Sequence, residues 1–292
     1  MREMSPNAQA ALLLPLDERV RYLQISRWIC YDYAEAILKD LQELLEHPKV
    51  LRMPNLLVWG DTNCGKTAII DRFCQEYPLR QNGEEEADVV PVLYIQAPPI
   101  PDERRFYSLI LDKLRVPHKT NERADRMMCQ ILKMFPKLGV RMLIVDEIHH
   151  ILAGNLQRQR AFLNVIKYLG NEAVIPIVGV GTISALNALQ TDAQLANRFE
   201  PRNLPRWRLD TRYRQLLASF EYVLPLAEES NLTEKEMATK LLDMSGGTIG
   251  ELSKLIRRAA IETIRQGREK ISLSLLEEVQ WIPPDVRNRP VA

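Results

Sequence analysis

The chain has 292 residues, of which 46% are hydrophobic and 26% are charged, and its formal net charge is +1. This length can bury a full core, so we expect one large domain and a smaller one. The composition is that of an ordinary soluble protein, and the balanced charge excludes a polybasic nucleic-acid binder, so any nucleic-acid site must be local.

The cysteine and hydropathy patterns indicate the compartment. The four cysteines have no Cys-x-x-Cys spacing, so we expect neither a zinc site nor a disulfide framework, and a reducing cytosol fits. The apolar run from Ala10 to Leu16 is too short to span a bilayer and has no cleavage site. We therefore expect a cytoplasmic protein without a signal or membrane segment.

The first 54 residues predict an N-terminal arm and a helix. Residues 1–30 mix apolar patches with arginines, as in an arm that docks on another surface. From Tyr31 to Glu46, apolar residues recur at helical spacing and predict an amphipathic helix. Pro48 and Pro54 bracket the connection to the strand after this helix.

A phosphate-binding motif comes next in the chain. Leu56 to Trp59 predicts a buried strand, and Gly60-x4-Gly65-Lys66-Thr67 leads from it into an amphipathic helix. Strand, glycine-flanked loop and helix form the context of a P-loop, whose N–H groups surround a triphosphate. We expect Lys66 to reach the β- and γ-phosphates and the Thr67 hydroxyl to ligate Mg²⁺. The expected nucleotide contacts from the loop are Gly60, Asp61, Thr62, Asn63, Cys64, Gly65, Lys66, Thr67 and Ala68.

Strands and helices then alternate up to about residue 206. This alternation predicts an α/β domain over 55–206 with a parallel sheet covered on both faces. In such sheets, ligands bind at the carboxyl ends of the strands. The further strands are expected at 89–96, 141–147 and 175–180, and the helices between them at 104–114, 124–135 and around 164–169.

Polar side chains end two of these strands. Asp146 closes a buried Met-Leu-Ile-Val run and is expected to hold the Mg²⁺ shell together with Thr67. Glu147 is expected to act as the base that orients the attacking water, and Thr182 as a polar sensor of the γ-phosphate. The extra strand between the P-loop and Asp146, and the lack of an Asn-Lys-x-Asp motif, favour ATP over GTP.

An arginine is predicted to complete a neighbouring site. Arg198 precedes the last expected core strand, and in ring ATPases an arginine from this region enters the adjoining subunit. Arg158 and Arg160 are rival candidates, and an ordinary surface arginine is the alternative. His149 and His150 complete an Asp-Glu-Ile-His sequence, but the residues after His150 do not spell a second helicase domain with its own motif. We expect both histidines to be ordinary residues that lie around the site or at the surface.

From Trp207 onward, the pattern is helical only. Four helices are expected at 213–224, 233–244, 249–266 and 273–280. They predict a small helical domain over 207–282, and after it a tail over 283–292 that lacks apolar periodicity.

Taken in order, these motifs resemble the AAA+ ATPases of transposons, namely the TniB and TnsC proteins and, more distantly, MuB. The resemblance covers roughly residues 30–280, and its C-terminal portion is the specific part. The segments that carry it are the P-loop, Asp146-Glu147, Gly179–Thr182, Asn197–Pro201, Glu229–Met237 and Ser245–Leu252.

The resemblance implies an α/β AAA+ P-loop ATPase, with a parallel sheet sandwiched by helices and a C-terminal helical lid. It also implies a transposition regulator that binds ATP and Mg²⁺ and assembles on duplex DNA as a filament or ring, in the nucleoid. Such proteins recruit and stimulate a DDE transposase, and some work with a TniQ-type adaptor. Slow hydrolysis of ATP to ADP and phosphate, often triggered by a partner, disassembles them.

Two regions bear on how far the resemblance extends. Family members line a DNA channel with residues that come after the second strand, which implies contacts from Arg104, Arg105, Lys119 and Thr120. Many AAA+ proteins place an arginine sensor after the glycine of a lid helix, whereas Gly250 is followed here by Glu251. The resemblance therefore does not imply a contact between a lid arginine and the nucleotide here.

Two other functions remain open from the sequence. A replication-type AAA+ helicase loader would share the nucleotide site but bind a helicase instead of a transposase. A nucleotide-gated scaffold would use ATP to hold its shape, with little turnover. The type of transposon, the symmetry of the oligomer and the choice of target site are not encoded in these motifs.

Overall fold

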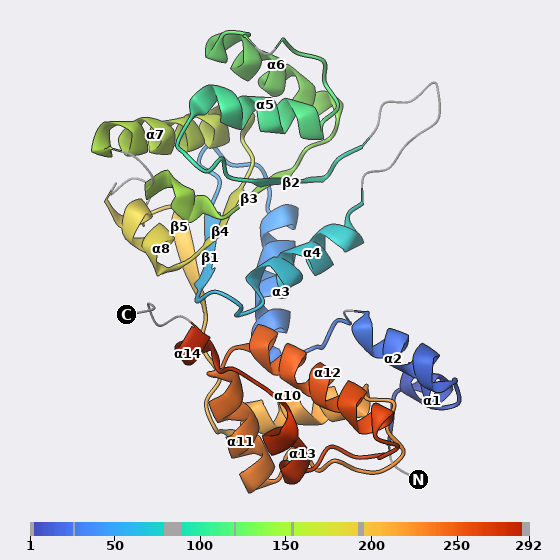
Figure 1. The fold of residues 1–292 in the computed structure, drawn as a ribbon. Helices are drawn as coiled ribbons and strands as arrows, with labels where there is room; N and C mark the ends of the chain where they lie inside the picture. The colour runs from blue at the N-terminus through green and yellow to red at the C-terminus, as the bar shows by residue number, and fades with distance from the viewer. Residues whose placement is uncertain are drawn as a thin grey trace. The chain divides into compact units, whose positions relative to one another are not determined.

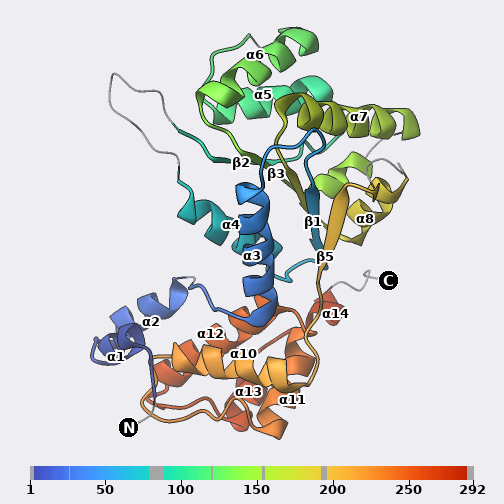
Figure 2. The same cartoon turned by 180° about the vertical axis from the view of Figure 1, so that it is seen from behind.

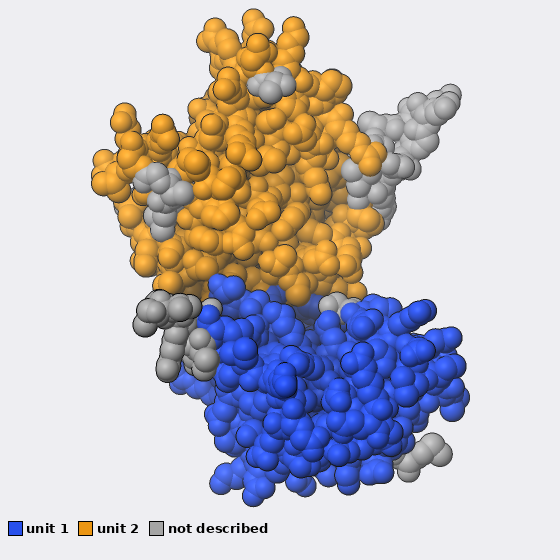
Figure 3. Space-filling view, in the orientation of Figure 1, with its two compact units in different colours: residues 1–35, 62–65, 205–292 blue, residues 36–61, 66–204 orange. Residues whose placement is uncertain are grey.

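The computed structural model describes residues 3–25, 27–78, 89–119, 121–152, 155–191 and 196–287. The chain forms two compact units, which Figure 3 distinguishes by colour. The α/β unit comprises residues 36–61 and 66–204, and the helical unit comprises residues 1–35, 62–65 and 205–292. The P-loop is thus shared, because its tip at residues 62–65 belongs to the helical unit.

The α/β unit is built on a five-stranded sheet with the order β2-β3-β4-β1-β5. All of its strand pairs are parallel, so the carboxyl ends of the strands share one edge. The strands are β1 (Asn55–Gly60), β2 (Val92–Gln96), β3 (Met142–Asp146), β4 (Ile177–Gly181) and β5 (Phe199–Leu204). The fully buried pattern of β3 and β4 is that of strands covered on both faces.

Helices cover both faces of this sheet. Figures 1 and 2 show α3 and α4 on one side and α7 and α8 on the other. These helices and their neighbours are α3 (Asp32–Glu46), α4 (Lys66–Glu76), α5 (Glu103–Lys113), α6 (Ala124–Lys137), the 3-10 helix η1 (Ile148–Leu152), α7 (Leu156–Ala173) and α8 (Ile183–Gln190). The apolar faces of α5, α6, η1, α7 and α8 share one core, in which Phe106 of α5 meets Phe162 of α7 edge to face, at 5.1 Å between ring centroids.

The second strand is shorter than the sequence predicts. The prediction began it at Val89, whereas β2 begins at Val92. Pro91 has no N–H to donate to the ladder, although its carbonyl still accepts hydrogen bonds from Arg141 and Met142. The acidic stretch at 84–88 lies outside the described residues.

The helical unit combines both ends of the chain. Its helices are α1 (Pro6–Leu12), α2 (Leu16–Gln24), α10 (Thr211–Tyr222), α11 (Lys235–Ser245), α12 (Ile249–Arg265), α13 (Leu273–Glu278) and α14 (Pro284–Arg287). The N-terminal arm docks here, because Arg19 of α2 forms an ion pair with Glu269 at 2.8 Å and donates to the carbonyl of Pro225. None of the described helices has the length and apolar content needed to cross a bilayer.

Candidate nucleotide-binding site

The P-loop connects β1 to the first residue of α4. Gly60 is required by packing, because a Cβ atom there would lie 2.4 Å from the carbonyl oxygen of Leu204 on β5. Lys66 is only 8% exposed, and its ammonium donates to the carbonyls of Gly60 at 2.8 Å and Asp61 at 2.7 Å. A buried ammonium needs such partners. The loop therefore holds the lysine at its own centre, beside the N-terminus of α4.

Asp146 lies next to the P-loop threonine. Its Oδ2 accepts hydrogen bonds from the Thr67 hydroxyl at 3.1 Å and from the Tyr94 hydroxyl at 2.9 Å, and its Oδ1 accepts from the Glu147 N–H at 2.8 Å. The carboxylate is almost fully buried, at 3% exposure. A hydroxyl and a carboxylate held side by side are the hard oxygen ligands that Mg²⁺ takes, so this donor set fits the ion.

Tyr94 was not singled out from the sequence. It lies in β2, whose residues pair in register with β3, and its hydroxyl points to the carboxylate that ends β3. Burial and the negative charge of Asp146 both raise the pKa of Tyr94. The phenol therefore stays protonated and remains a hydrogen-bond donor. The sequence did offer one indication of this role: Tyr94 lies two residues before the end of an edge strand, and therefore near the carboxyl edge of the sheet.

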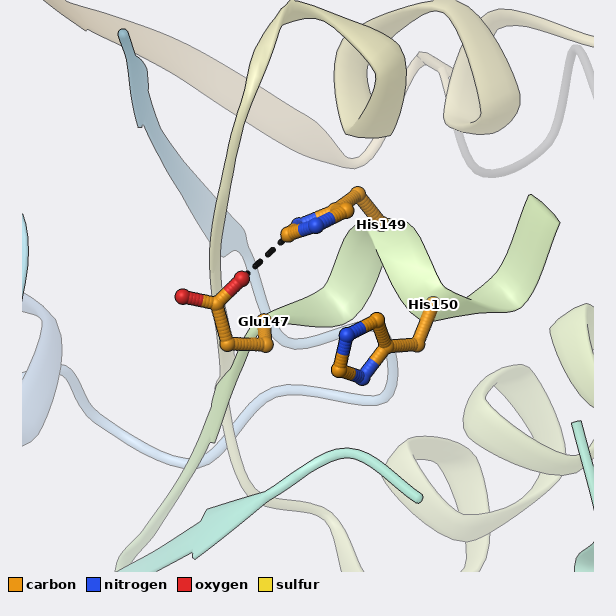
Figure 4. Close-up of side chains that lie close together, drawn as sticks. All are labelled: Glu147, His149 and His150. Carbon is orange, nitrogen blue, oxygen red and sulfur yellow. Dashed lines mark ion pairs between the residues drawn. The ribbon is translucent and has the colours of Figure 1, made fainter. Parts of the chain in front are cut away.

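Glu147 differs from its neighbour in backbone conformation, exposure and contacts. Its φ of +53° lies in the left-handed region, which a non-glycine residue adopts only when the surrounding structure holds it there. Its side chain is 37% exposed and lies beside the imidazole of His149, at 3.1 Å between Oε2 and Nδ1 (Figure 4). The ring nitrogen is not aligned for a hydrogen bond, so the attraction depends on the charge of His149.

Opposing effects act on the pKa of the His149 imidazole. Burial lowers its pKa most strongly, and the charges of His150 and Lys66 act in the same direction, whereas Glu147 and Asp146 raise it. The net result is a pKa below the usual value, so the ring is neutral at pH 7. The sequence predicted an ordinary residue around the site or at the surface, and the structure adds the contact of His149 with Glu147, the candidate base, at the start of η1.

The two remaining predicted residues lie at opposite edges of the sheet. Thr182 directly follows β4, between the P-loop strand and the Asp146 strand, and its side chain does not cap α8. Arg198 precedes β5, and its carbonyl accepts from the N–H of Asn55, the first residue of β1. Its guanidinium donates to Asn171 at 2.6 Å. Arg198 is therefore at the amino edge, away from its own P-loop.

The residues implied for DNA contact are exposed where the structure describes them. Arg104 and Arg105 occupy the first turn of α5, and Lys119 lies in the connection to α6. Thr120 lies outside the described residues. Arg104 and the segment 121–125 line a common depression.

The arginines between 198 and 214 are largely paired within the chain. Arg202 pairs with Asp40 and with Glu200, and Arg206 donates to the carbonyl of Gly246. The two carboxylates compensate the charge of Arg202, whereas the contact of Arg206 with a neutral carbonyl only fixes the position of its guanidinium.

These features define an AAA+ P-loop ATPase. The parallel sheet has this strand order, a P-loop follows β1, the buried Asp146 ends β3, and the chain also forms a small helical unit. Solved structures share this fold. They include the Aeropyrum pernix ORC2 protein in ADPNP–ADP complexes (15% identity, 88% of this chain and 70% of that chain covered, TM-score 0.62) and the ORC1 protein of the same organism in complex with DNA (17%, 92% and 68%, 0.60). The CDC6P protein of Pyrobaculum aerophilum is similar as well (16%, 86% and 67%, 0.55).

The family is shown by sequence. Residues 19–209 match the family of the bacterial TniB protein, and the chain belongs to that family. A search of characterised protein sequences found no match. The fold class and the TniB resemblance predicted from the sequence are thereby confirmed. The protein is a TniB-family, transposition-associated AAA+ ATPase.

Proposed function

We propose that this protein is an ATP-dependent regulator of DNA transposition, which assembles on duplex DNA in its ATP-bound state and recruits a DDE transposase. The observation that carries the proposal is the Thr67–Asp146 contact at the P-loop, in a chain of the TniB family. The contact supports a nucleotide and metal site, and the family supports the process that the site serves. A TniQ-type adaptor is a further expected partner.

Nucleotide binding uses groups that are already placed. The N–H groups of the P-loop and the N-terminus of α4 face the phosphates, and Lys66 exchanges its loop carbonyls for phosphate oxygens. Thr67 and Asp146 would hold Mg²⁺, and Tyr94 fixes the Asp146 carboxylate through its hydroxyl. When bound, ATP and Mg²⁺ supply the γ-phosphoryl group and the positive charge that neutralises it.

Hydrolysis needs a base, and Glu147 is the half-exposed carboxylate beside the site. Its side chain, once free of His149, would accept the proton of the attacking water, and Thr182, which directly follows β4, would act as the polar sensor of the γ-phosphate. The neutral state of His149 at pH 7 leaves this base available.

A second copy of the chain completes the site. Because Arg198 precedes β5 and β5 pairs in parallel with β1, the length of a six-residue strand separates it from its own P-loop edge, roughly 20 Å. An arginine side chain cannot cover that distance, so Arg198 acts on a neighbouring subunit or not at all. This position supports an ATP-dependent oligomer in which hydrolysis is slow until neighbours or a partner align the arginine.

DNA binding is expected to be weak in each subunit and strong in the assembly. Arg104, Arg105 and Lys119 are exposed cations, and contacts to phosphates are insensitive to sequence and sensitive to salt. Each subunit of a filament repeats the same phosphate contacts, so the assembly binds DNA more tightly than one subunit does. The fold shared with the ORC1 protein, whose structure was solved in complex with DNA, is consistent with this role.

The test is assembly on a duplex of random sequence. With ATP and Mg²⁺, we expect the wild-type protein to sediment as a DNA-bound oligomer, and the Lys66→Ala variant to stay unassembled. Lys39→Ala is the matched control, because Lys39 is an exposed lysine of the same unit that pairs with Glu43 on α3. A wild-type protein that ignores the duplex in the presence of ATP would overturn the proposal.

A further inference from the structure

Glu251 is a buried carboxylate at the start of α12, where many AAA+ proteins have an arginine. Its side chain is only 3% exposed. It accepts hydrogen bonds from the Asn63 amide at 3.1 Å, from the Lys254 ammonium at 3.0 Å, and from the Arg287 guanidinium. A buried carboxylate that accepts from three donors is held in one orientation, because each donor that it loses lowers the compensation of its charge.

Through Asn63, this carboxylate holds the tip of the P-loop. Asn63 has a φ of +63°, and its carbonyl accepts from the N–H of Gly250 at 2.9 Å. A Cβ atom at position 250 would lie 2.9 Å from that carbonyl, so the close approach requires glycine. Two consecutive residues of α12 therefore bind Asn63, one to its backbone and one to its side chain.

The partner from the C-terminal side is Arg287, in the last described turn, α14. Its guanidinium lies 5.5 Å from the ring centroid of Trp281, and the Trp281 indole donates to the carbonyl of Met244 at 2.7 Å. Through Trp281, Arg287 is thus linked to the end of α11, and its guanidinium donates to Glu251. Asn63, Glu251 and Arg287 form one continuous chain of contacts.

We propose that Glu251 is a positioning residue for nucleotide binding, and that Arg287 orients it, so that the C-terminal turn tunes the affinity of the P-loop for ATP. This inference rests on the proposed function of the same site. A loop held in its binding conformation loses less entropy when the phosphates arrive. Glu251 touches no reacting group, so its effect is on binding and not on the chemical step.

The same contacts suggest how the affinity is regulated. Any partner that draws the C-terminal turn away removes Arg287 from Glu251 and leaves Asn63 less firmly held in its left-handed conformation. Displacement of α14 would thereby promote nucleotide release.

The first experiment needs no nucleotide. Amide hydrogen exchange across residues 61–66 is measured in the wild type, in Arg287→Ala and in the control Arg268→Ala. Arg268 is similarly exposed (46% against 42%) and pairs with Glu278 in the same unit. We expect faster exchange in this segment for Arg287→Ala alone. Equal exchange in all three proteins overturns the inference, whether or not ATP binds.

The second experiment measures affinity and turnover with a fluorescent ATP analogue and steady-state hydrolysis. Arg287→Ala is expected to weaken binding about 3- to 10-fold, the value of about one hydrogen bond, with kcat at saturating ATP unchanged. Asn63→Gly should weaken binding as well, and glycine is used at position 63 because it keeps the positive φ. Arg287→Lys is expected to restore most of the affinity.

Unaltered affinity in Arg287→Ala, or a loss in kcat alone, contradicts the positioning role. A wild type that binds no ATP overturns the proposed function instead, and the exchange measurement still decides whether the C-terminal turn holds the loop.

Discussion

The two units contribute to the P-loop in different ways. In the α/β unit, the buried Lys66 and Asp146 and the exposed Thr67 gather at the carboxyl edge of a parallel sheet, beside the half-exposed Glu147. In the helical unit, Asn63 and Glu251 hold the loop tip through groups that have no part in phosphoryl chemistry. We therefore expect variants of Asn63 and Glu251 to change nucleotide affinity and not turnover, whereas turnover should depend on Glu147 of the α/β unit.

Glu147→Gln, in the α/β unit, should have the strongest consequence. Loss of the base should lower kcat about 100- to 10,000-fold while ATP binding is retained, and the DNA-bound assembly should persist because hydrolysis no longer disperses it. Single-turnover hydrolysis and the lifetime of the assembly measure this. Glu172→Gln, an exposed change in α7, serves as the control. An unchanged lifetime would favour a nucleotide-gated scaffold.

Tyr94→Phe should change metal affinity and leave the base untouched. Asp146 loses one of its hydrogen bonds, and groups of this kind that orient a metal ligand are worth about 10-fold in metal affinity. The Mg²⁺ concentration that gives half-maximal hydrolysis should rise accordingly, with kcat recovered at high Mg²⁺. If the Mg²⁺ dependence is the same as in the wild type, the hydrogen bond has no role in holding the ion.

His149 makes turnover dependent on pH. Its lowered pKa keeps the ring neutral at pH 7, and acidification below that pKa creates an imidazolium that pairs with Glu147. We expect kcat to fall a few-fold between about pH 7 and pH 5.5 in the wild type, and less in His149→Asn. The groups facing this ring are Glu147, His150, Lys66 and Asp146.

The same shift affects stability in a defined direction. Because the folded pKa of His149 lies below its ordinary value of 6.5, the unfolded chain binds more protons in that interval. The free energy of unfolding should therefore decrease as the pH falls through it, and His149→Asn should remove this part of the decrease. Denaturant unfolding at pH 7.5 and pH 5.5 tests the sign.

Glu251→Gln, in the helical unit, should have the smallest of these effects, a modest loss of stability. Burial raises the pKa of Glu251, but the hydrogen bonds from Arg287 and Lys254 outweigh it, so the pKa lies below its ordinary value of 4.5. The ionised carboxylate therefore stabilises the fold above pH 4.5, and this contribution is lost as the pH falls through the folded pKa. We expect Glu251→Gln to lower the free energy of unfolding by about 1 kcal/mol at pH 7.

The loss of unfolding free energy caused by Glu251→Gln should become smaller at the lowest pH at which the wild type remains folded. If Glu251→Gln instead lowered kcat as strongly as Glu147→Gln, the separation of turnover from affinity between the two units would be wrong.

Local pattern was sufficient for much of the nucleotide site. An apolar run, two glycines and a Lys-Thr pair predict a P-loop because each residue type has a backbone or charge requirement that is visible in the sequence. A carboxylate that closes a buried run, as Asp146 does, can be assigned in the same way. The helices at 32–46 and 249–265 are predicted by their apolar periodicity, and the structure has them within one residue of the predicted limits.

Other features depended on contacts between residues far apart in the chain. The approach of Tyr94 to Asp146 is set by the pairing of β2 with β3, and the placement of Arg198 at the amino edge by the pairing of β5 with β1. Glu251 looked like a missing sensor, but its partners Asn63 and Arg287 are 188 and 36 residues away.

The family, the phosphate-binding loop and the carboxylates at the strand end could therefore be read from the amino-acid order alone, because they rest on residue type and short spacing. The side chains that orient Asp146, restrain Glu147 and hold the loop tip became visible only in the folded chain. Those roles arise from strand register and from the burial of single charges, and neither is encoded in any local stretch of residues.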